Sequence, residues 1–261
     1  MIRFCTLYSS SSGNCAFVSD SKTNILIDAG VSASKIVTLL KELGVSPFDI
    51  HGILVTHEHS DHICGLDVLT RKYSIPVYAN ANTFRAIGSG AHSIDEKHMN
   101  LIVTGDCFSM GTAIVRSFKT PHDSAESVGY TVSFDNHKIG IATDTGCITK
   151  PMLSALAGCE AVIIESNHDV DLLNNGSYPY PLKKRILSDS GHLSNEKCAW
   201  LATQLALWGT KHIALGHLST SNNEPKTAFD TVGKLLEQNG FSIGDDVFLT
   251  VASQAEITYI L

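Results

Sequence analysis

The stretch ILVTHEHSDHICGL, residues 53–66, decides the interpretation of this chain. Three histidines and two acidic residues follow its apolar start within six positions. Imidazole nitrogens and carboxylate oxygens bind zinc, iron and manganese, and the end of a strand gives such ligands a rigid base. On a loop that leaves a strand, His57 and His59 would converge on one point, while Asp61 and His62 would point to a second. The spacing H-x-H-x-D-H therefore predicts a metal site.

Three more polar residues follow apolar runs that are expected to be strands. His122 follows AIVRSFKT, Asp144 follows IGIAT, and His217 follows HIALG. Strand ends on a rigid scaffold are where functional loops are positioned, so these residues are candidates for the same site. Any one of them alone could be a structural residue, but together with the first motif they complete a set of seven ligands.

The seven ligands divide into two predicted metal positions. The first is expected to use His57, His59 and His122, the second Asp61, His62 and His217, and Asp144 is expected to bridge both. Zinc, manganese and iron all accept such ligands, so the residues predict two divalent ions without selecting between these metals.

Composition limits the classes of protein to which the chain could belong. Its 261 residues, of which 43% are hydrophobic, can form one sizeable core. The net charge of −7 argues against a protein that coats nucleic acid by bulk charge, although a local basic groove or a bound metal remains compatible. No apolar run is long enough to cross a bilayer, and no pattern of a secretory signal is seen.

The seven cysteines contain no C-x-x-C pair and suggest free thiols in a reducing compartment. The expected location is therefore cytoplasmic. Cys64 and Cys147 lie near candidate ligands in the sequence. Because the predicted ligand set is complete without them, they are expected to be small buried thiols.

Strands are expected in clusters with helices between them. A hairpin is expected on either side of the segment SSSSGN, and residues 31–45 predict an amphipathic helix that Ser32 caps and Gly44 ends. Further helices are expected at 195–209 and 224–240, the latter with Pro225 near its first turn. This order predicts two β-sheets packed face to face with helices outside, in a single domain that spans residues 1–261.

Several motifs resemble those of one family. The motifs THEHSDH, PHD, TDTG and LGHLS are similar to the successive metal motifs of the metallo-β-lactamase-fold hydrolases. Over nearly the whole chain, SSSSGN, FKTPHDSAESVGYTV, IIESNHD and RILSDSGHLSN resemble the YycJ/WalJ subgroup. The resemblance implies an α/β fold, a four-layer αββα sandwich with a dinuclear metal site at one edge. It also implies 5′-to-3′ exonuclease activity on DNA and a relationship to ribonuclease Z.

The expected activity is dinuclear-metal-dependent hydrolysis of phosphodiester bonds. Two cations would hold a bridging hydroxide that attacks phosphorus, and they would neutralise charge on the phosphate oxygens. Asp61 is expected to orient the hydroxide in addition to binding metal. The expected partner is nucleic acid, and an open site without a large inserted cap suits DNA ends or single strands.

The resemblance also points to residues outside the ligand set. By likeness to the related tRNA-processing nucleases, His192 in SGHLSN is the candidate for phosphate stabilisation or general acid catalysis, with a structural turn as the alternative. Glu165 is expected to hydrogen-bond a neighbouring imidazole. From its place at the end of a strand before the first helix, Asp28 is either a partner of a metal-bound histidine or only a polar strand end. For His168 a functional and a structural role are both open.

Four further candidates concern the substrate. Asn14, in the loop of small residues, could line the mouth of the site or simply complete a turn. Lys183 and Arg185, in YPYPLKKR, could contact DNA or belong to a solvated basic helix. Ser194 lies in the same GHLSN segment as His192 and is a further candidate.

Three other functions are compatible with part of this set of residues. A thioesterase or lactonase of this fold would use the same ligands. A flavodiiron-like oxidoreductase is expected to carry a carboxylate at position 59 and a flavin domain, so His59 argues against it. A non-catalytic metal-binding partner of a signalling or repair complex is the third possibility, against which the complete ligand set argues.

Overall fold

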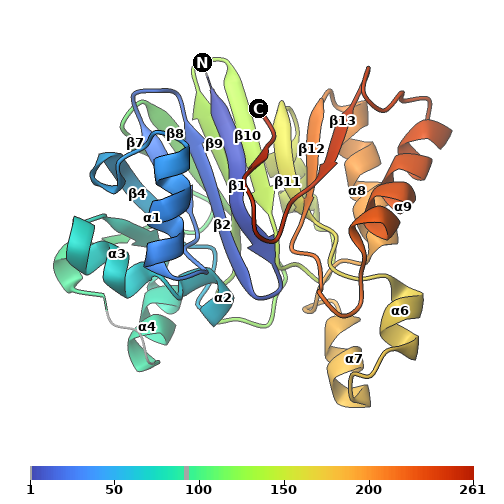
Figure 1. Ribbon diagram of the computed structural model, residues 1–261, viewed down its shortest axis with the longest axis horizontal. Helices are drawn as coiled ribbons and strands as arrows, with labels where there is room; N and C mark the ends of the chain where they lie inside the picture. The colour runs from blue at the N-terminus through green and yellow to red at the C-terminus, as the bar shows by residue number, and fades with distance from the viewer. Residues whose placement is uncertain (1, 91–93) are drawn as a thin grey trace.

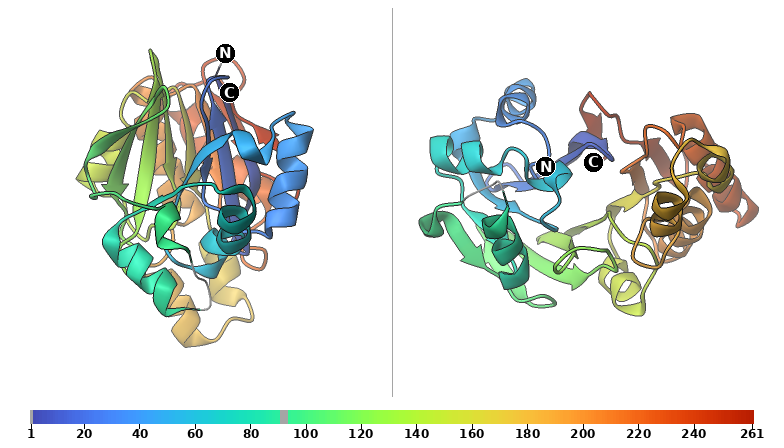
Figure 2. Two further views of the ribbon diagram at one scale, coloured as in Figure 1. Left: turned by 90° about the vertical axis from the view of Figure 1, so that its left-hand side faces the viewer. Right: turned by 90° about the horizontal axis from the view of Figure 1, so that it is seen from below.

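A computed structural model describes residues 2–90 and 94–261. The chain forms two seven-stranded sheets that face each other, with helices on the outer face of each (Figures 1 and 2). This arrangement confirms the predicted four-layer αββα sandwich. No helix in the described ranges is long and apolar enough to span a membrane.

The first sheet is formed mainly by the N-terminal half of the chain. Its strands, in spatial order, are β14 (Thr258–Tyr259), β1 (Arg3–Ser10), β2 (Gly13–Ser19), β3 (Asn24–Ile27), β4 (Ile50–Leu54), β5 (Val77–Ala79) and β6 (Met99–Leu101). The strands from β3 to β6 are parallel, so their carboxyl ends meet at one edge. Its outer helices are α1 (Ala33–Glu42), α3 (Leu66–Tyr73) and α4 (Ala81–Ser89).

The second sheet also contains a run of four parallel strands. Its strands, in spatial order, are β13 (Phe248–Val251), β12 (His212–Gly216), β11 (Ala161–Glu165), β10 (His137–Ala142), β9 (Val128–Phe134), β8 (Ala113–Lys119) and β7 (Cys107–Met110). The strands from β10 to β13 are parallel. The helices against its outer face are α5 (Lys150–Leu156), α8 (Asn195–Leu207) and α9 (Pro225–Gln238).

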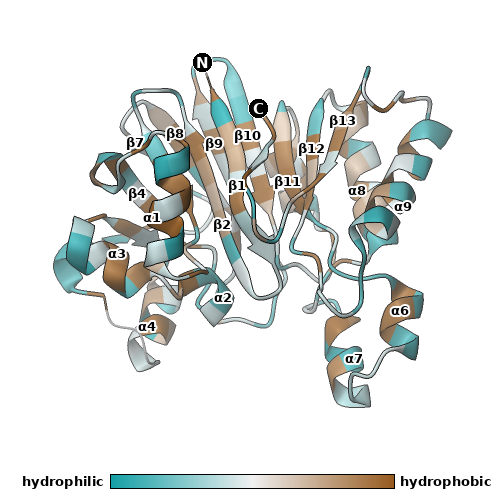
Figure 3. Cartoon of the chain, viewed as in Figure 1, coloured by the Kyte–Doolittle hydropathy of each residue, from teal (hydrophilic) through white to brown (hydrophobic). Residues whose placement is uncertain are grey.

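Three hydrophobic clusters hold the four layers together. Along β3, Ile25 and Ile27 pack between the sheets, whereas Leu26 packs with Ile36 of α1 on the outer side. A third cluster fills the space between the second sheet and its helices. Strands that are buried on both faces are rich in hydrophobic residues, and brown segments recur along the strands of both sheets in Figure 3.

Several local predictions are confirmed. The strands β1 and β2 form the expected hairpin. The side chain of Ser32 accepts a hydrogen bond from the backbone of Lys35 at the start of α1, and Gly44 adopts the left-handed conformation beyond its end. Pro225 is the first residue of α9. These features follow from local rules for capping and for glycine, which do not depend on distant contacts.

Beyond the three predicted helices, the described residues form six more α-helices, among them α3, α4 and α5, and a helix at the basic run YPYPLKKR was expected only as an alternative to DNA contact. One-turn helix α2 (Ser60–Ile63) follows β4, so Asp61 and His62 lie on a helix and not on the expected loop. Helices α6 (Val170–Asn175) and α7 (Tyr180–Ile186) lie beyond the lower edge of the second sheet in Figure 1. At this length a helix shows too little of the 3.6-residue repeat to be recognised from its apolar residues.

Candidate metal centre

The predicted ligands lie together at the edge where the strands end. His57 follows β4, His122 follows β8, Asp144 follows β10 and His217 follows β12. These elements belong to both sheets, and their carboxyl ends share the same edge. The structure therefore brings together all seven candidates, and their role as ligands stays a prediction.

The first group consists of three imidazoles. Nδ1 of His59 lies 3.1 Å from Nε2 of His57 and 3.3 Å from Nε2 of His122. Ligand atoms at 2.0–2.1 Å from a tetrahedral zinc ion lie roughly 3.4 Å from one another, so this spacing fits one ion.

The second group combines one carboxylate and two imidazoles. Oδ2 of Asp61 lies 3.3 Å from Nε2 of His62 and 3.5 Å from Nε2 of His217. Asp144 lies between the groups, with Oδ2 at 3.1 Å from Nε2 of His62 and Oδ1 at 3.7 Å from Nε2 of His122. Oδ2 of Asp144 is buried and makes no hydrogen bond within the described residues. A buried carboxylate oxygen without a donor is costly unless a cation is bound, which supports the fit.

Hydrogen bonds on the outer side of the rings fix which nitrogen carries the proton. Nδ1 of His62 lies 2.7 Å from a carboxylate oxygen of Asp28, and Nδ1 of His122 lies 3.0 Å from the carbonyl oxygen of Gly191. Nδ1 of His217 lies 2.8 Å from Oε1 of Glu165. Because these oxygens accept and do not donate, each neutral ring donates from Nδ1 and directs the lone pair of Nε2 inward. These inward nitrogens bind either protons or a metal cation, so a bound cation would replace the protons that the neighbouring carboxylates stabilise.

Thr56 extends this arrangement to His57. Its hydroxyl donates to Oδ2 of Asp28 and lies 3.0 Å from Nδ1 of His57. Since its one proton is directed to Asp28, the hydroxyl accepts from His57. A single buried carboxylate thus orients His62 directly and His57 through Thr56, which confirms that Asp28 contacts a candidate ligand. Thr56 was not among the predicted residues, although its place directly before the first histidine was visible in the sequence.

We expect Asp28→Ala to weaken cation binding by roughly 10- to 100-fold, because His62 loses the acceptor that orients it. Competition with a coloured chelator measures this affinity, and thermal unfolding reports on folding. Asp28→Asn should be affected less, because its amide oxygen still accepts from Nδ1. Exposed Asp245 offers a control substitution to alanine. Unchanged affinity in Asp28→Ala would refute the orienting role.

Three of the six described non-glycine residues with a positive φ angle lie at this edge. Asp28, Asp144 and His217 all adopt positive φ angles, of 61°, 54° and 56°. Residues other than glycine rarely adopt this conformation, and such strain accumulates at functional sites that the surrounding fold holds rigidly. Here the turn at each strand end directs the side chain toward the centre. Aspartate and histidine are enriched among the residues that adopt this conformation, which is a weak signal in the sequence.

Gly30 makes room for the second group. A Cβ atom at this position would lie 1.6 Å from the carbonyl oxygen of Asp61. The backbone of α2 therefore packs directly on the end of the DAG segment, and Asp61 takes its position from that contact. Asn14 lies beside it, with Nδ2 at 3.4 Å from Oδ2 of Asp61 and 3.1 Å from Nε2 of His62. This places Asn14 at the site.

Glu165 connects the two GHLS segments. Its Oε1 lies 2.7 Å from Nδ1 of His192 and 2.8 Å from Nδ1 of His217, and its Oε2 accepts from the backbone of Thr145 and Leu193. The GHLS segments at 191–194 and 216–219 therefore lie close together in the folded chain. Burial raises the pKa of Glu165, but the two imidazoles outweigh it and lower the pKa to about 2.

The mutual attraction of acids and imidazoles polarises the centre. Burial lowers the pKa of His217, but Asp144, Asp61 and Glu165 outweigh it and raise that pKa to about 10. Burial likewise raises the pKa of Asp61, yet hydrogen bonds from His217 and His62 hold it well below its usual value. The carboxylates are therefore ionised, and they stabilise positive charge next to them. Metal cations would compete with protons for this position, so the metal affinity would decrease as the pH falls.

The remaining candidates take different positions. The ring of His192 lies 5.0 Å from that of His122 and 5.3 Å from that of His217, so it borders both groups. His168 is buried, its ring nitrogens make no hydrogen bond among the described residues, and burial lowers its pKa to about 4. Ser194 caps α8 by accepting from the backbone of Lys197. The capping contact gives Ser194 a structural role, whereas no side-chain hydrogen bond assigns a role to His168, and a direct role for either stays a prediction.

The two basic candidates on α7 have partners. The ammonium of Lys183 donates to the carbonyl oxygens of Asn174 and Gly176, each at 2.7 Å. The guanidinium of Arg185 pairs with Asp123, the neighbour of His122. Lys183 thereby joins α6 to α7, and Arg185 joins α7 to the metal-ligand loop. Whether either contacts DNA stays a prediction.

The cysteine expectation is partly wrong. Cys64 is exposed and Cys147 is half-buried, so neither is the buried thiol that was expected. Cys64 follows the last residue of the short helix α2 as its C-cap. All seven cysteines are free thiols, as predicted.

Comparison with known proteins agrees with this arrangement. The family model described as a β-lactamase superfamily domain matches residues 23–217. The protein named exodeoxyribonuclease YycJ from Bacillus anthracis is 41% identical over 244 residues, which cover 94% of this chain and 92% of the relative. The protein named exodeoxyribonuclease WalJ from Streptococcus pneumoniae serotype 2 is 39% identical over 246 residues, 94% of this chain and 91% of the relative.

A solved structure supports the fold. The metallo-β-lactamase fold protein YhfI from Bacillus subtilis superposes with a TM-score of 0.74 and covers 99% of both chains, at 13% sequence identity. At this identity the likeness concerns the arrangement of strands and helices only.

Proposed function

From the premise that this chain belongs to the β-lactamase superfamily, and within it to the YycJ and WalJ group, we propose that it is a metal-dependent DNA exonuclease with 5′-to-3′ polarity. The superfamily is one of hydrolases. The observation that carries the proposal is the convergence of seven potential ligand side chains, in two groups that share Asp144, at one edge of the sandwich.

The ligand groups and their neighbours have distinct proposed tasks. His57, His59 and His122 would hold one divalent cation, and Asp61, His62 and His217 a second, with Asp144 shared. When bound, the cations would lower the pKa of a water molecule and neutralise charge on the phosphate. Asp61 also accepts a hydrogen bond from the attacking oxygen and orients it.

His192 is the proposed proton donor. Its Nδ1 donates to Glu165, which leaves Nε2 as the atom that would deliver a proton to the departing sugar oxygen. Glu165, shared with His217, keeps the ring in this orientation. The backbone of His192 is also fixed, because its N–H donates to the carbonyl oxygen of Ile186 at 3.0 Å. That contact joins the proposed proton donor directly to the end of α7.

Wild-type protein purified without chelator is expected to contain about two divalent ions per chain, because the two ligand groups are each complete. Elemental analysis of the purified protein measures this content. Asp144→Ala should reduce it, since Asp144 faces both groups. A content of one ion in wild type, unchanged in Asp144→Ala, would contradict a shared aspartate.

A substrate panel tests the proposed activity. End-labelled single- and double-stranded DNA and RNA, a thioester and a lactone are each incubated with the protein in Mn²⁺, Zn²⁺ or Mg²⁺. We expect DNA to be shortened progressively from its 5′ end. Hydrolysis of the thioester or lactone without cleavage of nucleic acid would replace the proposal with the alternative of a small-molecule hydrolase.

A further inference from the structure

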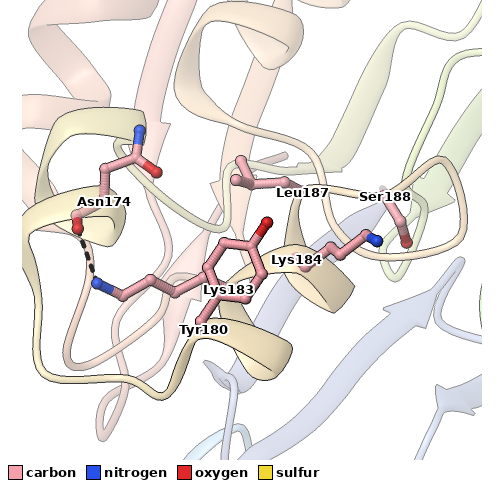
Figure 4. A pocket seen from close by; sticks show the side chains of 6 residues that line it. All are labelled: Asn174, Tyr180, Lys183, Lys184, Leu187 and Ser188. Carbon is pink, nitrogen blue, oxygen red and sulfur yellow. Dashed lines mark hydrogen bonds between the residues drawn. The ribbon is translucent and has the colours of Figure 1, made fainter.

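A cavity of about 490 Å³ lies between α6 and α7. Its lining consists of Asn174, Tyr180, Lys183, Lys184, Leu187 and Ser188 (Figure 4). This volume is within the roughly 300–1,000 Å³ that is usual for small-molecule sites. Among the residues that the structure describes, this lining contains two lysines and no acidic side chain, although the whole chain has a net charge of −7.

The cavity combines an aromatic face with a cation that has no partner among the described residues. Tyr180 is 77% exposed and Leu187 is 39% exposed, so both side chains present apolar surface to solvent here. Lys183 is engaged by two backbone carbonyls and Arg185 by Asp123. Lys184 is exposed and makes no such contact in the part of the chain that the structure describes; in Figure 4 it extends toward Ser188.

Helix α7 is tied to the edge that carries the metal-ligand groups. The backbone of His192 donates to the carbonyl oxygen of Ile186 at 3.0 Å, and that of Asp123 donates to the carbonyl oxygen of Ser190 at 3.0 Å. Arg185 reaches the same Asp123. A nucleic-acid strand that extends from the metal centre past His192 would therefore contact α7 next.

We propose that this cavity is a subsite for one unpaired nucleotide of the substrate strand, outside the scissile position. The base would lie against Tyr180 and Leu187, and its phosphate would pair with Lys184. Aromatic faces stack on bases of any sequence and cations contact phosphates, which is the chemistry of single-strand binding. The proposal rests on the proposed nuclease function and deepens it, because it names the residues of this cavity as the ones that would bind unpaired DNA.

The test measures binding of a short phosphorothioate single-stranded DNA, labelled at its 3′ end, to the metal-loaded protein by fluorescence anisotropy over a series of salt concentrations. Tyr180→Ala should weaken binding roughly 5- to 150-fold, whereas Tyr180→Phe should retain it, because the ring face remains. Lys184→Ala should make the slope of log K against log salt shallower by about 0.7, the value for one phosphate contact on a single strand. Lys184→Arg should keep the slope.

Controls separate this subsite from general effects. Tyr259→Ala removes another exposed aromatic ring, on β14, and Lys234→Ala removes an exposed charge on α9; both should bind as wild type. Hydrolysis of bis-p-nitrophenyl phosphate, which carries no nucleotide beyond its scissile phosphate, should be unchanged in Tyr180→Ala and Lys184→Ala. Thermal unfolding of each variant verifies its folding.

The outcomes distinguish this inference from the nuclease function. If wild type cleaves DNA but both alanine variants bind like wild type, the subsite is refuted and the nuclease function stands. If binding depends on Tyr180 and Lys184 as expected but DNA is not cleaved, the subsite stands and the nuclease function fails. Absence of single-strand binding by wild type would overturn the subsite.

Discussion

Asp61→Ala will lower the rate of phosphodiester hydrolysis by roughly 10³-fold or more while the protein remains folded. Metal catalysis contributes several kcal/mol to stabilising a transition state, and each 1.36 kcal/mol corresponds to about tenfold in rate. Asp61 lies at 3.3 Å from His62 and 3.5 Å from His217, so its removal opens the second ligand group. The first group keeps its three imidazoles.

Stopped-time assays on end-labelled DNA measure the loss, and elemental analysis measures the remaining metal. We expect a content of about one ion per chain, since the group that contains His57, His59 and His122 is intact. Asp61→Asn is the matched variant, because it keeps the shape but not the charge, and Asp245→Ala is the control for an exposed acid. Near-wild-type hydrolysis by Asp61→Ala would show that the proposed mechanism is wrong.

His192→Ala will lower turnover on DNA by roughly 10²–10⁴-fold, the usual range for a general acid or base. Metal content should not change, because His192 is outside the two ligand groups and Glu165 still accepts from His217. The loss should be smaller on bis-p-nitrophenyl phosphate, whose leaving group needs no proton. Parallel measurement of kcat on both substrates provides the comparison.

Two results would change the role that we propose for His192. Equal losses on DNA and on the activated diester would exclude proton donation and leave phosphate binding. Loss of a metal ion would reject both roles, because Asp144, Glu165, His192 and His217 also lie close enough to hold an ion. His192→Gln, which retains a hydrogen-bond donor without an imidazole, separates phosphate binding from proton transfer.

The layers and the position of the site were predictable from the sequence because both depend on short-range patterns. Apolar runs mark strands, and polar residues directly after them, such as His57 and Asp144, lie where strand ends meet. The contacts of Glu165 were only partly predictable. A neighbouring imidazole was expected, but its sharing between His192 and His217 depends on segments that meet only after folding.

The parts that could not be predicted have physical reasons. Strands β5 and β6 have three residues each, and α6 and α7 have six and seven, too short for a periodic pattern. Aspartate and histidine tolerate a left-handed backbone better than most residues, but their type alone does not show that Asp28, Asp144 and His217 adopt it. The partners of Lys183 and Arg185 could not be foreseen either, because a run of basic residues does not reveal which charges are free.

The most direct test follows the release of nucleotides from 5′-labelled DNA by wild type and Asp144→Ala, first after removal of metal with a chelator and then after addition of Mn²⁺. We expect wild type to be inactive without metal and to release nucleotides from the labelled end once metal is restored, while Asp144→Ala stays inactive throughout. Wild-type protein that holds its metal ions and leaves DNA intact would contradict a two-cation nuclease at this edge of the sandwich.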